Sequence, residues 1–426
     1  MKRFLYLFFI IILLLLHGCH STGADTSHTA IEAKPKTVHI YDIADTVDVC
    51  DEASEYEEAP AEGALLRIAV IGDMNGSYGS KEYPEELSLA IDRIIAEKPD
   101  LVINVGDMVA GQRPKLDYEG MWAAFHSIVT DRLKEAGVLM AQVPGNHDAS
   151  AYAGYEKERE IYIEEWNARK PELAYLDDSM YPLYYSFIHS GVLFLALDAT
   201  TLEPLDDDQY AWLERELKKN QDELPVVVFG HVPLFPITSI KPREILRDPR
   251  LPVLFENYGV QLYITGHQHA YFPAHHNGVS YLHAGALGGG PRPLRANAGI
   301  APKTLSFVSI YPKQKPAYET YVMDQGQRRI KLNRLPTYLK LPKTILARYD
   351  VSQEDALFAQ RHWISAHLTR SQMKMLIESY KAKKLDFELI PEWELSYDVN
   401  AELEHSFVEI EENPIFNEPA YRELIR

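Results

Sequence analysis

Cysteine is nearly absent from this chain of 426 residues, in which only Cys19 and Cys50 occur. Two cysteines allow at most one intrachain disulfide, so the fold has to rest on its hydrophobic core. Basic residues are also scarce, with 43 Lys and Arg against 62 Asp and Glu and a formal net charge of −19. This balance argues against a nucleic-acid-binding surface, which would show a basic patch. An anionic ligand would have to be attracted by local charge rather than by the overall field.

Long apolar runs are missing except at the start of the chain. Lys2 and Arg3 precede an apolar stretch over residues 4–16, which is short for a membrane span and typical of a signal peptide. The LHGC string at 16–19 resembles a bacterial lipobox, although histidine is unusual as its second residue. We therefore predict a lipoprotein signal peptide over residues 1–19 with the lipid on Cys19. The alternative is an ordinary secretory signal in which the cysteine is incidental.

The lipobox resemblance implies a location for the mature protein. A lipidated Cys19 would anchor it in a lipid bilayer of the bacterial cell envelope, extracytoplasmic, on the periplasmic side or in the outer membrane. Residues 20–63 are polar, small or acidic, with nine acidic residues and no lysine or arginine between Thr37 and Leu66. Such a stretch buries too little apolar surface to order itself, so we predict an acidic disordered linker in which Cys50 is a thiol without a role.

Buried-strand patterns in the rest of the chain repeatedly stop on polar residues. The strings that follow these apolar runs are GDMN at 72–75, GDMVAG at 106–111, GNHD at 145–148, GH at 230–231 and GHQH at 266–269. Helical patterns open at Pro84 and around Trp122 to Ala136, and this alternation predicts a parallel sheet with crossover helices. Open α/β sheets place their ligands at the carboxyl ends of strands, where these strings fall.

The pattern changes in the second half of the chain. A helical insertion at about Tyr155–Arg169 is followed by a hairpin that turns at 189–191 and by an amphipathic helix over 206–221. We divide this part into a body at 64–341 and a mainly helical C-terminal extension at 342–426. In the extension, Ser352 and Asp355 form a capping-box pattern before a helix through His367, and a second helix is expected at Ser371–Lys384. The extension shows no chemistry of its own.

The ordered set of strings resembles the calcineurin-like metallophosphoesterase superfamily, over about Arg67 to Tyr311 and in its purple-acid-phosphatase-like or bacterial phosphoesterase branch. Each string alone could be a helix cap or a hydrogen-bonded structural histidine, but the ordered combination argues against that reading. The resemblance implies a four-layer αββα sandwich of class α/β, with 64–341 as the catalytic domain. It also implies two divalent metal ions and the hydrolysis of a phosphomonoester or phosphodiester.

The resemblance assigns ligands residue by residue. Asp73 and His269 would bind the first metal, and Asp107 would bridge both metals. Asn146, His231 and His267 would complete the second. Asn75 would be a further ligand of the first metal at a position where many relatives carry histidine. An amide oxygen suits harder ions, so among Mn, Fe and Zn we mildly favour Mn.

The family mechanism is an in-line attack on phosphorus by a hydroxide held between the metals. His147 is then expected to act as general acid, with Asp148 orienting its imidazole. For substrate binding we single out Arg292 in the run GALGGGPRPLR at 285–295, which is otherwise a loop bordering the site. Arg295 in the same run is the alternative. Tyr271 is the second substrate candidate, as part of a tyrosine-rich rim with Tyr78, Tyr152 and Tyr155, and His275 and His276 are interpreted as loop residues.

Two departures separate the chain from familiar branches. Ala110 stands three residues after Asp107, where purple acid phosphatases place an iron-binding tyrosine, so we expect neither purple colour nor an obligatory ferric ion. The GDxxDRG string of protein phosphatases is also missing. The alternative function is a non-catalytic, lipid-anchored surface protein that keeps the fold as a binding module. A structural lipoprotein that uses metal only for stability ranks below it, and the oligomeric state stays open.

Overall fold

The computed structural model describes residues 63–220, 223–295, 301–332, 335–341, 344–362, 364 and 366–381. These residues all belong to one compact unit within 51–426. The predicted signal peptide with Cys19, and the predicted linker except for Gly63, lie outside the described residues, as does the chain beyond 381. Within the described ranges, no helix has the length and apolarity needed to cross a membrane.

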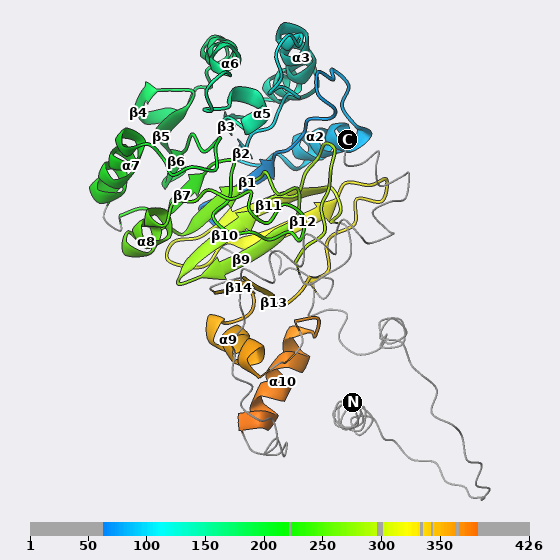
Figure 1. Cartoon of the computed structure of the whole chain (residues 1–426), viewed down its shortest axis with the longest axis vertical. Helices are drawn as coiled ribbons and strands as arrows, with labels where there is room; N and C mark the ends of the chain where they lie inside the picture. Colours follow the sequence, from blue (N-terminus) through cyan, green and yellow to red (C-terminus); the bar gives the residue numbers. More distant parts are fainter. Residues whose placement is uncertain are drawn as a thin grey trace, which may run out of the picture. The chain divides into compact units, whose positions relative to one another are not determined.

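Two sheets form the centre of the fold (Figure 1). The smaller sheet has, in spatial order, β12 (Ala317–Val322), β11 (Thr304–Ile310), β1 (Leu66–Ile71), β2 (Leu101–Asn104) and β3 (Met140–Gln142). The larger sheet has, in spatial order, β13 (Tyr338–Lys340), β14 (Ile345–Arg348), β9 (Phe272–His276), β10 (Val279–His283), β8 (Leu262–Thr265), β7 (Val226–Phe229), β6 (Val192–Ala196), β5 (Tyr184–His189) and β4 (Ala174–Met180). Pairing is parallel along β1–β2–β3 and along β6–β7–β8–β10, as the crossover pattern predicted.

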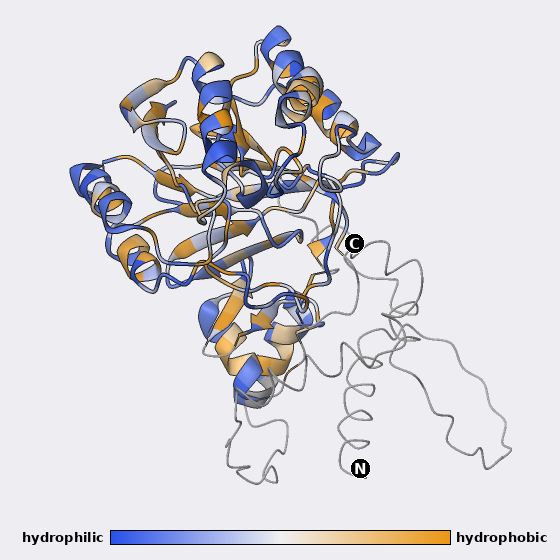
Figure 2. Cartoon of the chain, turned by 45° about the horizontal axis from the view of Figure 1, so that its top comes forward, coloured by the Kyte–Doolittle hydropathy of each residue, from blue (hydrophilic) through white to orange (hydrophobic). Residues whose placement is uncertain are grey.

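Helices cover the outer faces of the two sheets. Those of the amino-terminal half are α2 (Glu85–Glu97), α3 (Tyr118–Phe125), the π-helical turn η2 (His126–Thr130), α4 (Asp131–Glu135), α5 (Asn146–Ala149) and α6 (Glu156–Ala168). Those that follow are α7 (Asp207–Asn220), α8 (Arg250–Asn257), α9 (Gln353–Arg361) and α10 (Arg370–Lys381). Hydrophilic and hydrophobic residues are interspersed along the helices (Figure 2), and in α2 and α7 the buried residues recur at helical spacing, so these helices bury one face.

The alternation of side chains along the strands explains the layers. In β7, Val227 and Phe229 pack into the core between the sheets, whereas Val226 and Val228 face a second core. The first core also includes residues of α2 and α3, and the second includes residues of α7 and α8. Central strands such as β7 and β8 are buried on both faces because a helix layer lies outside each sheet, whereas β4 at the edge of the larger sheet is largely exposed. The predicted four-layer αββα sandwich is confirmed.

Local details differ from the sequence-based expectations. The helix expected around Trp122–Ala136 is interrupted by η2, and the helix opened by the Ser352 cap ends at Arg361 rather than at His367. His275 and His276, interpreted as loop residues, lie in β9. That interpretation is wrong because GHQH is followed by a further antiparallel strand that pairs with β10.

The large sheet continues past residue 341, where the sequence predicted the extension to begin. β14 pairs with β9, with Ala347 opposite His275. Ile345 and Ala347 of β14 face a third small core formed with α9 and α10, while Leu346 packs into the second core. The two helices of the extension thus pack on an outer patch of the same sheet that carries GHQH.

Candidate metal centre and active site

The motif residues converge because the strands that precede them end at one edge. Asp73 follows β1, Asp107 follows β2, and His267 and His269 follow β8. All four adopt a left-handed backbone, with φ of 48°, 56°, 65° and 50° respectively. Such conformations are unfavourable for residues with a Cβ and are retained where the surroundings hold them, which is typical of functional sites.

Asp107 lies against the backbone of the GNHD motif. Its Oδ1 accepts a hydrogen bond from the His147 backbone N–H at 2.9 Å, and it is 1 % exposed. A Cβ on Gly145 would lie 2.1 Å from the Asp107 nitrogen and 2.2 Å from its Oδ1. Only glycine therefore permits this approach, which brings the loops after β2 and β3 together.

One group of ligand atoms gathers around the amide oxygen of Asn146. This Oδ1 is 3.0 Å from Nε2 of His231 and 2.9 Å from Nδ1 of His267, and the two ring nitrogens are 3.2 Å apart. The Asn146 amide nitrogen donates to Gln112 Oε1 at 3.1 Å, which directs the amide oxygen toward the histidines. Nδ1 of His231 lies 2.8 Å from the Val105 carbonyl, which can only accept, so Nδ1 carries the proton and Nε2 can offer its lone pair.

A second group gathers around Asp73. Its carboxylate accepts the His267 backbone N–H, at 3.0 and 2.9 Å to its two oxygens, and its Oδ1 lies 3.3 Å from Nε2 of His269. The carbonyls of Gly289 and Gly290, at 2.9 and 3.0 Å, hold Nδ1 of His269. Asn75 is buried beside this group, and its amide nitrogen donates to the Val109 carbonyl at 3.3 Å, which leaves its amide oxygen as the remaining polar atom.

The two groups meet at His231 and Asp107, where Nε2 lies 3.3 Å from Oδ1. One ligand atom from each of Asp73, Asp107 and His231 lies within 4.8 Å of the others, and all three residues are buried. Lone pairs that converge in this way repel one another unless a cation lies between them, so the donor set fits divalent metal ions.

The protonation equilibria indicate the same need for positive charge. Burial by itself would raise the pKa of Asp107, but the imidazoles of His231 and His147 hold that pKa well below its usual range. Burial by itself would lower the pKa of His231, but Asp107 and Asp73 raise it to about 9. Without a metal, the buried carboxylates thus keep a proton on His231, in the place where a metal ion would supply the positive charge.

The predicted partnership of His147 and Asp148 is wrong. The Asp148 carboxylate is completely buried and accepts the backbone N–H groups of Met108, Val109 and Gly145 at 2.8, 2.9 and 2.8 Å. It therefore ties the loop after Asp107 to the GNHD motif and does not contact the imidazole. The Gly111 carbonyl, 3.3 Å from Nδ1 of His147, takes the orienting role instead.

His147 lies at the mouth of the site. Its side chain is 23 % exposed, and its Nε2 is 4.0 Å from Oδ2 of Asp107. Its ring contacts that of Tyr78, with centroids 5.3 Å apart, and the Arg113 guanidinium lies 3.7 Å from the centre of the Tyr78 ring. A cation and an aromatic ring therefore border the candidate general acid.

The tyrosine-rich rim is only partly present. Tyr78 and Tyr152 are each 39 % exposed, and Tyr155 is half-buried. Tyr271 is 1 % exposed and packs into the core between the sheets, so its predicted role in stacking on a substrate is wrong. It directly precedes β9.

The glycine-rich loop at 285–295 is hydrogen-bonded to the GDMN motif. The backbone N–H groups of Gly288 and Gly289 donate to the carbonyls of Asp73 and Asn75 at 2.7 and 2.9 Å. These amides are thus engaged by the GDMN motif, and the loop borders the site, where its carbonyls also hold His269. Arg292 lies beside His267, and its Nη1 donates to the His267 carbonyl at 3.1 Å. Arg295 donates instead to the carbonyl of Lys340 in β13.

Three orienting residues escaped the sequence interpretation. Gln112 holds the Asn146 amide, Gln268 hydrogen-bonds to the loop 237–244, and Glu244 of that loop reaches His267. Gln268 belongs to the GHQH string, so its position was visible. Glu244 is distant from every motif in the sequence, and no local pattern marks it.

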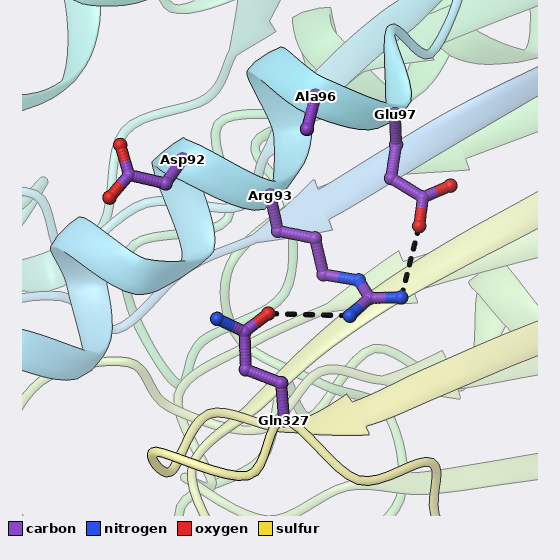
Figure 3. Close-up of a pocket in the computed structure, with 5 residues that line it drawn as sticks. All are labelled: Asp92, Arg93, Ala96, Glu97 and Gln327. Carbon is purple, nitrogen blue, oxygen red and sulfur yellow. Dashed lines mark hydrogen bonds and ion pairs between the residues drawn. The ribbon is translucent and has the colours of Figure 1, made fainter.

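A separate pocket of about 330 Å³ lies away from these motifs, against α2 (Figure 3). It is lined by Asp92, Arg93, Ala96, Glu97 and Gln327. The Arg93 guanidinium there donates to Gln327 and Glu97 at 3.3 and 2.9 Å and lies 3.5 Å from the centre of the Tyr321 ring. Its terminal nitrogens are therefore satisfied, and none of the motif residues lines the pocket.

Comparison with known proteins agrees with this geometry. Residues 66–271 match the model of the family described as calcineurin-like phosphoesterase. This segment, just under half of the chain, is similar to that family. Members of the family depend on two metal ions, and the group of Asp73, Asp107 and His231 supplies candidate metal ligands in this chain.

The curated proteins that this chain is similar to include plant purple acid phosphatases. Purple acid phosphatase 15 of Arabidopsis thaliana is 24 % identical over 270 residues, which cover 56 % of this chain and 47 % of the relative. Purple acid phosphatase 13 of the same plant is 25 % identical over 297 residues, covering 60 % and 53 %. The chain spans about half the length of these relatives.

Solved structures with similar folds include two phosphatases. A purple acid phosphatase from yellow lupin seeds has a TM-score of 0.48 at 16 % identity, covering 65 % of this chain and 54 % of the other. A dimetal phosphatase from Danio rerio has a TM-score of 0.42 at 14 % identity, covering 60 % of this chain and 98 % of the other.

Proposed function

We propose that this protein is a metal-dependent hydrolase of phosphate esters that uses two divalent ions. The observation that carries the proposal is the convergence of carboxylate, amide and imidazole atoms from separate motifs on one buried region. The proposed ligands are Asp73, Asn75 and His269 for one ion, Asn146, His231 and His267 for the other, and Asp107 for both. With two divalent ions bound, the site would supply Lewis acidity and a water ionised near neutral pH as the nucleophile.

The role of His147 in this proposal is proton transfer to the leaving group. The Gly111 carbonyl can only accept, so the hydrogen bond at Nδ1 places a proton there and leaves Nε2 as the atom that exchanges protons with the substrate. A protonated Nε2 at the mouth of the site can donate to the leaving oxygen.

Both the metals and the substrate range stay proposals. The amide oxygen of Asn75 favours manganese over zinc, and the small Ala110 leaves no tyrosinate for a ferric ion. Phosphomonoesters and phosphodiesters are both candidate substrates, and Arg292 is retained as a substrate-binding candidate. The LHGC string supports attachment of the protein to the envelope through Cys19, which loss of Cys19→Ser protein from the membrane fraction would test.

The test is hydrolysis of phosphate esters by protein reconstituted with Mn²⁺, with metal content measured on the same samples. Asp107→Asn is expected to abolish activity because it removes the carboxylate shared by both ions. His147→Ala should lower kcat by about 10²–10⁴-fold for alkyl phosphates, the range for general acid catalysis. Its effect on nitrophenyl phosphate should be smaller, because that leaving group needs little protonation. Glu203→Gln, in an exposed ion pair with Arg247, serves as the control.

A protein that carries two metal ions and hydrolyses no class of phosphoester would contradict the proposal and favour the non-catalytic binding module. If His147→Ala lowered kcat equally for alkyl phosphates and nitrophenyl phosphate, His147 would not be the general acid, but the protein would still be a hydrolase.

A further inference from the structure

The starting observation is a buried nitrogen without a hydrogen bond. His267 points its Nδ1 at Asn146 and His231, and its Nε2 has no hydrogen-bond partner among the described residues. The Glu244 carboxylate lies opposite, with Oε2 3.6 Å from Nε2. Glu244 comes from the long loop between β7 and α8, whereas His267 follows β8, so the fold brings them together over 23 positions.

The proton on the His267 ring decides what this contact means. A histidine that binds a metal ion does so as a neutral ring, which carries one proton on either Nδ1 or Nε2. If that proton is on Nδ1, it can hydrogen-bond to Asn146, but Nε2 then turns a lone pair toward a carboxylate. If the proton is on Nε2, it faces an acceptor, and Nδ1 offers its lone pair to a metal ion beside Asn146 and His231.

Hydrogen bonds from Gln268 hold the loop that carries Glu244. The Gln268 side chain is fully buried; its Oε1 accepts the backbone N–H groups of Ile237 and Thr238 at 2.9 and 3.1 Å, and its Nε2 donates to the Glu244 carbonyl at 3.0 Å. The GHQH motif therefore fixes, through its own glutamine, the loop that carries the carboxylate to the preceding histidine.

The charge of Glu244 is balanced locally. Lys241 Nζ lies 2.8 Å from Oε1, and Arg292 Nη1 lies 3.4 Å from Oε2 while also donating to the His267 carbonyl. The carboxylate is thus held close to His267, with Oε2 between Arg292 and the ring. A carboxylate in contact with the far nitrogen of a metal-binding histidine raises the basicity of the ligand atom.

We propose that Glu244 is a positioning residue for the second metal site, which accepts the Nε2 proton of His267 in a hydrogen bond and so selects the tautomer that binds metal through Nδ1. The inference rests on the proposed two-metal function. It also assigns Arg292 to the support of this carboxylate, in addition to its candidate role in binding substrate.

The experiment titrates metal-free full-length protein with Mn²⁺ by calorimetry and compares the wild type with Glu244→Gln. An amide can donate to Nε2 and stabilise the wrong tautomer, so one of the two Mn²⁺ sites should weaken by about 10–100-fold while the other is unchanged. Glu203→Gln makes the same chemical change in an exposed ion pair with Arg247 and should leave both affinities unchanged. Thermal unfolding of the metal-free variants checks that the loop is not simply lost.

Selectively ¹⁵N-histidine-labelled protein loaded with Zn²⁺ gives a readout independent of affinity. The wild type should show His267 protonated at Nε2, and Glu244→Gln should lose or weaken that signal. The role of Glu244 would be overturned if both sites of Glu244→Gln bound Mn²⁺ as tightly as in the wild type, or if both sites were weakened equally. A wild-type protein that binds no metal ions would instead overturn the proposed function itself.

Discussion

The two sides of the candidate metal centre are oriented by different parts of the chain. On the Asp73 side, backbone groups do the work: the Gly289 and Gly290 carbonyls hold His269, and the Val109 carbonyl holds Asn75. On the Asn146 side, the Val105 carbonyl holds His231, but it is the side chain of Gln112 that fixes the Asn146 amide. A backbone-held ligand is changed by altering the path of the chain, whereas a ligand held by a side chain can be adjusted by a single substitution.

The largest effect on activity is expected from a substitution of Gly288, in the glycine-rich loop at 285–295. A Cβ on Gly288 would lie 2.2 Å from the Asn75 carbonyl oxygen and 2.4 Å from the Met74 carbonyl carbon, so Gly288→Ala must push the GDMN motif away. Displacement of a site by about 1 Å can cost about 10²-fold in rate, and we expect a loss of that order in kcat/KM.

Gly289→Ala provides the matched control. A Cβ at Gly289 approaches the Asn75 carbonyl oxygen only to 3.8 Å, which is an ordinary contact. Kinetics and Mn²⁺ titration of the two variants should therefore separate them clearly. Similar activity in both would show that the Asp73 side does not depend on the loop path.

A smaller effect is expected on the Asn146 side. Gln112→Met keeps the length of the side chain but removes the acceptor for the Asn146 amide, which can then rotate. We expect about 10-fold weaker Mn²⁺ binding at one site, the lower end of the range for residues that orient ligands. Gln327→Met is the control. Both glutamines have a positive φ, but Gln327 lies at the separate pocket of Figure 3. Equal binding by both variants would contradict the role of Gln112.

The smallest effect concerns the stability of the folded protein and a residue of β10, the strand before the glycine-rich loop. His283 ends β10, is 2 % exposed, and neither of its ring nitrogens has a hydrogen-bond partner in the described structure. Burial lowers its pKa to about 3. Between about pH 6.5 and pH 3 the unfolded chain binds a proton here that the folded protein does not, so stability falls as the pH falls, by at most about 1.4 kcal/mol per pH unit.

His283→Leu removes this titration along with an unpaired polar group. Urea unfolding of the metal-free protein at pH 7 and pH 5 should show a smaller loss of stability in the variant than in the wild type. An identical loss in both proteins would mean that His283 does not contribute to acid sensitivity.

Much of the fold could be predicted because it is written in local patterns. Apolar runs that stop on Asp73, Asp107 and His231 gave both the parallel strands and the edge at which they meet. The hairpin turn at 189–191 lies between β5 and β6 as expected. The extent of the extension was harder to read, since β14 joins the sheet through contacts with β9, about 70 positions earlier.

The support of the site could be predicted less well. Asp148 stands next to His147 in sequence, which suggested a partnership, but the first turn of α5 directs its carboxylate to the backbone of Met108 and Val109. Tyr271 stands two residues after His269, but it enters the core before β9 begins. Adjacency in sequence does not determine direction when neighbouring residues point to different sides, and contacts such as that of Glu244 depend on loop paths that no periodicity encodes.

The pairing of β14 with β9 has a consequence for the preparation of shortened proteins. A version ending at residue 341 would strip the strand that covers β9 and uncover backbone groups of the sheet that carries GHQH. Unprotected strand edges recruit other chains, so such a fragment would be prone to self-association even with every motif intact. A soluble fragment would have to extend through α10, which completes the small core over β14.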